Sequence, residues 1–143
     1  MKEEFLFSEL NISTEDFRRK ALRWAEKFNQ VAYYSDNLIP YLYNGFENLL
    51  AVSDSEPQVV EPEKAFGFLQ TISDSGKFWC GLLNYDLKNQ VEKLSSKHQE
   101  HVGFPVVQFF EPEIHLTFQA LSATVFSEKV APEIALFCCR FLS

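Results

Sequence analysis

Strict alternation of apolar and polar residues near the end of the chain is the feature that most constrains the fold. Over 114–118 and again over 121–125, every second residue is apolar. Because side chains of a strand point alternately to its two faces, each stretch predicts a half-buried strand. The short Gln119-Ala120 connection favours pairing of the two strands with each other. His115 is expected to face water or the rim of a partner.

The other periodicities predict an α+β fold with a mainly antiparallel sheet flanked by helices. Apolar residues recur at helical spacing behind the cap-forming sequence Asn11–Asp16, and proline stands in a first helical turn at Pro62 and at Pro132. Short apolar runs between turn residues predict strands. Helices are expected over 14–30, 62–72, 87–94 and 132–142, and strands over 31–34, 46–52, 78–84 and 106–110, with 59–60 weakly extending the sheet of 46–52.

The run from Phe78 to Asn84 is continuously apolar, which is typical of a strand covered on both faces. A glycine inside a strand often marks the close approach of another backbone. We therefore expect this strand to be central in its sheet, with a neighbouring chain segment close to Gly81.

Composition favours one folded domain spanning residues 1–143. Hydrophobic residues make up 46% of the chain and aromatic residues 15%, more than a disordered chain carries. The formal net charge of −7 disfavours nucleic acid and anionic membranes as partners. The sequence has neither a signal-peptide run nor a stretch long enough to span a membrane, which predicts a cytoplasmic protein.

Reactive residues do not form a recognisable catalytic or metal-binding motif. Cys80, Cys138 and Cys139 are interpreted as buried free thiols, and His98 and His101 as loop residues rather than ligands. Glycine-rich phosphate loops, zinc patterns and nucleophile elbows are absent from the sequence. The apolar stretch before Ser143 has no polar tail, so we expect further sequence downstream.

One longer run carries a resemblance to a family. The run 78–94, followed by Gly103-Phe-Pro105 and by 109–112, resembles the N-terminal region of component I of the chorismate-utilising enzymes. In that family a glycine-bearing strand enters Tyr-Asp and a short helix containing Glu, which match Tyr85, Asp86 and Glu92. Phe46–Ala51 resembles the family's upstream strand. Aminodeoxychorismate synthase is the most similar branch, and anthranilate synthase component I is the next.

The resemblance implies an N-terminal domain of a biosynthetic enzyme, forming an incomplete half of a layered scaffold. The parent enzyme would aminate chorismate to 4-amino-4-deoxychorismate for para-aminobenzoate and folate synthesis, using Mg²⁺ and ammonia from a glutamine amidotransferase subunit. The family's catalytic groups and magnesium ligands lie in its C-terminal part. The resemblance therefore assigns no catalytic or metal residue to this chain, which would be inactive without its C-terminal catalytic part.

Two further site interpretations stay open. Family members can bind tryptophan with a Leu-x-Ser turn and a downstream basic residue, and here Ser35, Asp36 and Asn37 form a shifted turn, with neither Lys nor Arg in 41–46. A freestanding amino-acid-binding module is thus one alternative, and a protein-interaction module is another. For Tyr85 and Asp86 the favoured interpretation is structural, with Asp86 capping a helix and Tyr85 in the core.

Overall fold

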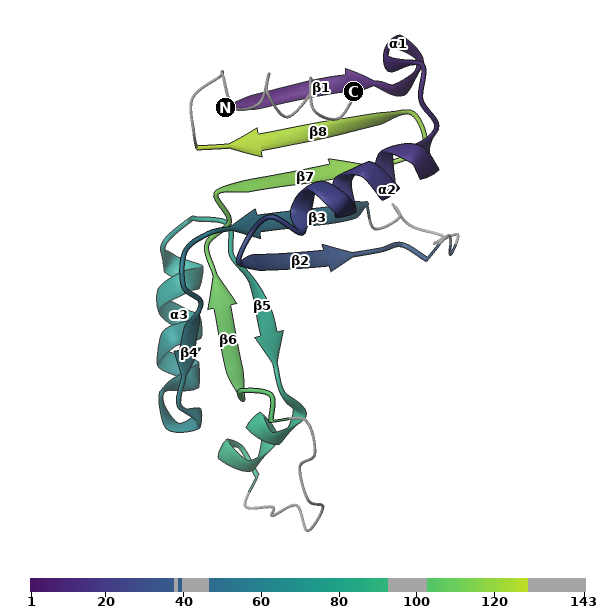
Figure 1. Cartoon of the computed structure of the whole chain (residues 1–143). Helices are drawn as coiled ribbons and strands as arrows, with labels where there is room; N and C mark the ends of the chain where they lie inside the picture. Colours follow the sequence, from purple (N-terminus) through teal and green to yellow (C-terminus); the bar gives the residue numbers. More distant parts are fainter. Residues whose placement is uncertain (38, 40–46, 93–102, 129–143) are drawn as a thin grey trace. The chain divides into compact units, whose positions relative to one another are not determined.

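A computed structural model describes residues 1–37, 39, 47–92 and 103–128 of the chain. The chain forms two compact units (Figure 1). The first unit combines residues 1–54 with the residues from 112 onward, and the second consists of residues 55–111. Both units contain antiparallel strands and helices, so the predicted α+β class with mainly antiparallel sheets is confirmed.

The first unit is built on a five-stranded antiparallel sheet. The predicted pair at 114–125 is present, and Phe118 lies opposite Ala123 across the connection. A strand that the sequence analysis did not anticipate, Lys2–Leu6, lies along the edge, and the amino group of Met1 donates to the carbonyl of Ser127 at its end. The strand order is β1 (Lys2–Leu6), β8 (Ser122–Ser127), β7 (Ile114–Phe118), β3 (Asn48–Ser53) and β2 (Gln30–Tyr34).

Helix α2 (Thr14–Ala25) lies across one face of this sheet. The Ser13 side chain caps it by accepting from the backbone N–H of Asp16, and the buried side chains of its inner face include Phe17. The Phe17 ring lies 5.3 Å from that of Phe118 and 4.8 Å from that of Phe7 in the short helix α1 (Phe7–Leu10). The helix ends before the predicted residue 30, because the chain must turn into β2.

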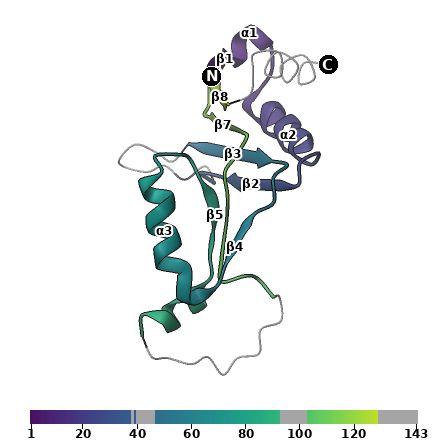
Figure 2. The same cartoon turned by 90° about the vertical axis from the view of Figure 1, so that its left-hand side faces the viewer.

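The second unit contains a three-stranded antiparallel sheet with helix α3 (Ala65–Asp74) against it (Figure 2). Ala65, Val107 and Leu87 form its buried core, and the ring of Phe68 on α3 lies 6.1 Å from that of Phe109. The strand order is β4 (Gln58–Val60), β6 (Val107–Phe110) and β5 (Cys80–Leu83). The described residues of the unit also form two short 3₁₀ helices, η1 (Pro62–Lys64) and η2 (Tyr85–Gln90).

Two predictions about strand placement are wrong. Strand β5 lies at an edge of its sheet and not at the centre, and 59–60 belongs to the second sheet instead of extending the sheet of β3. The expected coverage of both faces is also wrong, because Phe78 and Leu83 are exposed. An apolar run contains no information about the neighbours at the two edges of a strand. The predicted close approach at Gly81 is confirmed, since a Cβ there would lie 2.2 Å from the carbonyl oxygen of Gln108.

The predicted helix over 87–94 is replaced, as far as it is described, by the 3₁₀ helix η2. The helix predicted over 132–142, with Cys138 and Cys139, lies outside the described residues. So do His98, His101 and the segment 41–46.

Candidate functional site

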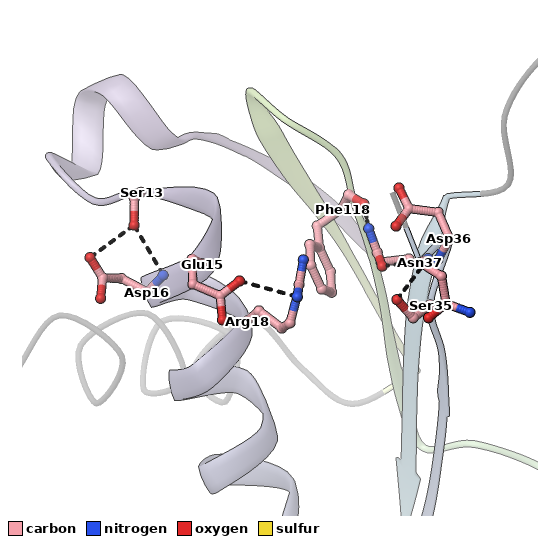
Figure 3. A network of polar contacts seen from close by, with 9 residues as sticks. Ser13, Glu15, Asp16, Arg18, Ser35, Asp36, Asn37 and Phe118 are labelled. Carbon is pink, nitrogen blue, oxygen red and sulfur yellow. Dashed lines mark hydrogen bonds and ion pairs between the residues drawn. The ribbon is translucent and has the colours of Figure 1, made fainter. Parts of the chain in front are cut away.

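The turn proposed for amino-acid binding directly follows β2, as the sequence predicts. The Ser35 hydroxyl accepts from the backbone N–H of Asn37 at 3.1 Å, and the N–H of Ile39 donates to the carbonyl of Asp36 at 3.1 Å. Asn37 adopts a left-handed conformation with φ of 51°, which asparagine tolerates better than most residues. Ser35 and Asp36 are half-buried and Asn37 is exposed, so the three residues form one ordered turn (Figure 3).

A buried asparagine anchors this turn to the sheet. Asn48, at the start of β3, is only 3% exposed. Its side-chain oxygen accepts from the backbone N–H of Asp36 at 3.3 Å, and its amide nitrogen donates to the carbonyl of Phe118 at 3.3 Å. Asn48 is not among the residues predicted from the sequence, although its place as a polar residue directly before the apolar run Leu49–Val52 is a signal.

Two of the four basic side chains of α2 pair with carboxylates of the same helix. Arg18 pairs with Glu15 at 3.1 Å, and Arg19 pairs with Asp16 at 2.7 Å. Figure 3 shows the Glu15–Arg18 pair and the Ser13–Asp16 cap on the same helical segment. Such pairs one turn apart stabilise a helix modestly and reduce the net positive charge that the helix offers to an anion.

The junction between β5 and η2 is capped by Asn84 and not by Asp86. The Asn84 side chain accepts from the backbone N–H of Asp86 at 3.2 Å, and its own N–H donates to the carbonyl of Val106 at 2.8 Å. Asn84 has the extended conformation of an N-cap residue, whereas Asp86 already belongs to the first turn of η2. The predicted capping role of Asp86 is therefore wrong by two positions.

Tyr85 lies on the surface, which corrects its predicted place in the core. Its side chain is 78% exposed, and the ammonium group of Lys88 lies 3.9 Å from the ring centroid. Leu87 fills the core position of this segment instead. Glu92 is also exposed, so the motif residues Tyr85 and Glu92 present their side chains to solvent. The structure does not bring them together with the Ser35 turn in one unit, because residues 55–111 form the second unit.

His115 is half-buried on the face of the first sheet that is opposite to α2. Its ring stacks on that of Phe126 at 4.7 Å with an interplanar angle of 10°, and the ammonium group of Lys2 lies 5.7 Å from the Phe126 centroid. Burial lowers the pKa of His115, because the charged imidazolium loses hydration. The neutral ring is thus favoured near pH 7.

Cys80 is a buried free thiol, as predicted. Burial raises its pKa to about 11, so the thiol stays protonated and weakly nucleophilic at neutral pH. Among the described residues, no three His, Cys, Asp or Glu side chains gather as a metal site would require. The described helices also include none that is long and apolar enough to cross a membrane.

No protein-family model matches this chain, and no curated protein matches it significantly. The resemblance carried by residues 78–94 therefore stays a prediction.

Proposed function

We propose that this chain is the N-terminal part of component I of an aminodeoxychorismate synthase. Its role is that of a scaffold: the chain supports a separate catalytic part that aminates chorismate to 4-amino-4-deoxychorismate. The catalytic part supplies the magnesium ligands, and a glutamine amidotransferase subunit supplies ammonia. Anthranilate synthase component I, which belongs to the same family, is the alternative parent.

The observation that carries this proposal is the path of the chain from β5 into η2. Gly81 permits close contact with β6, and Asn84 then turns the strand into the Tyr85-Asp86 junction. This is the order of features that the resemblance implies for the N-terminal region of the family. The α+β class with antiparallel sheets agrees with the same expectation.

The chemistry of the described side chains is consistent with a scaffold. The Cys80 thiol is held in its protonated form, and Asn48 uses both ends of its amide to fix backbone groups. The exposed large apolar side chains of the described residues belong mostly to the second unit, among them Phe66, Tyr85 and Phe104. Exposed apolar surface favours association with another polypeptide surface.

A direct experiment compares three proteins in the amination of chorismate with ammonia and Mg²⁺. These are the chain alone, the catalytic part of a family enzyme alone, and a fusion of the two. The proposal predicts no turnover by the chain and faster turnover by the fusion than by the catalytic part. The attached catalytic part sets the product, so the two parents are distinguished by comparing fusions to an aminodeoxychorismate synthase and to an anthranilate synthase catalytic part, with the larger acceleration expected for the matching parent. Turnover by the chain alone would contradict the scaffold role.

A second candidate function, binding of a free amino acid, is favoured by the ordered turn at Ser35–Asn37. The Asp36 carboxylate and the Ser35 hydroxyl can accept hydrogen bonds from an ammonium group. Asn48 holds the backbone between them in place. Calorimetric titration with tryptophan and other amino acids tests this function. Heat that disappears in Asp36→Ala, while the variant stays folded, would support it, and no heat with any amino acid would exclude it.

A further inference from the structure

We draw no further inference here: the strongest candidate, the face of the five-stranded sheet turned away from α2, where His115 stacks on Phe126, carries nothing because the described part of the chain does not show what covers it.

Discussion

Asn48, at the start of β3, accepts a hydrogen bond of 3.3 Å from the backbone N–H of Asp36, which lies in the turn after β2. The same side chain donates to Phe118 in β7, so one buried amide links β3, β7 and the turn after β2. Removal of such a side chain destabilises the fold because its backbone partners are left buried without a hydrogen bond. Each such unpaired group costs about 1–3 kcal/mol. The position of the Ser35 turn therefore depends on a residue outside the turn.

Replacement of Asn48 by alanine should destabilise the protein by about 2 kcal/mol or more, because a backbone N–H and a backbone carbonyl lose their partner. Urea unfolding measures this change. Ser35→Ala is the matched control, as it removes only an exposed hydrogen bond to Asn37 and should cost less than about 0.5 kcal/mol. Equal losses in the two variants would mean that Asn48 does not anchor the turn.

Two glycine substitutions should have opposite effects. Gly81→Ala places a methyl group 2.2 Å from the carbonyl oxygen of Gln108, which the paired strands cannot relieve without moving, and we expect a loss of about 1–3 kcal/mol. Gly67→Ala, within α3, meets no atom within 4 Å and should stabilise the protein by about 0.5–1 kcal/mol. Thermal unfolding of both variants shows whether each substitution raises or lowers the stability of the protein. A neutral Gly81→Ala would show that β5 and β6 are farther apart than described.

Tyr85 and Leu87 distinguish the surface from the core of the second unit. Tyr85→Ala should change stability by less than about 1 kcal/mol, because only an exposed contact with Lys88 is lost. Leu87→Ala should cost about 2–4 kcal/mol, because it leaves a cavity beside Ala65 and Val107. Chemical denaturation checks both values. A larger loss of stability for Tyr85→Ala than for Leu87→Ala would mean that Tyr85, and not Leu87, is the core residue of this segment.

His115 should make the protein less stable in mild acid. Its pKa is lowered in the folded state, so the unfolded chain binds the proton more readily. The stabilisation is present above the unfolded value of about 6.5 and is lost as the pH falls toward the lower, folded pKa. Melting temperatures measured between about pH 7.5 and 5 should therefore fall toward acid. His115→Gln should flatten this dependence, and an unchanged slope in that variant would assign the effect to other groups.

Strands whose two faces differ could be predicted from the sequence, and those that depend on distant partners could not. The alternation at 114–125 located β7 and β8 because one face is buried and the other is polar. Strand β1 could not be predicted because Lys2, Glu3 and Glu4 give it no apolar pattern. It is stabilised by pairing with β8, which is distant in sequence.

The candidate site was predictable only in part, for a similar physical reason. Turn residues at Ser35–Asn37 marked the turn, since their side chains bond locally to the backbone. The anchor Asn48 acts on residues distant in sequence, and no local pattern reports such a bond. The apolar character of the 78–84 run likewise did not reveal that β5 lies at an edge, nor that Tyr85 leaves the core.

The scaffold role is best tested by measuring chorismate amination by the fused and the separate proteins. With chorismate, ammonia and Mg²⁺, we expect aminodeoxychorismate from the fusion of this chain with an aminodeoxychorismate synthase catalytic part, formed faster than by that part alone, and none from this chain alone. Product formed by the isolated chain, or a fusion no faster than the catalytic part without it, would contradict the claim that these residues serve as its scaffold.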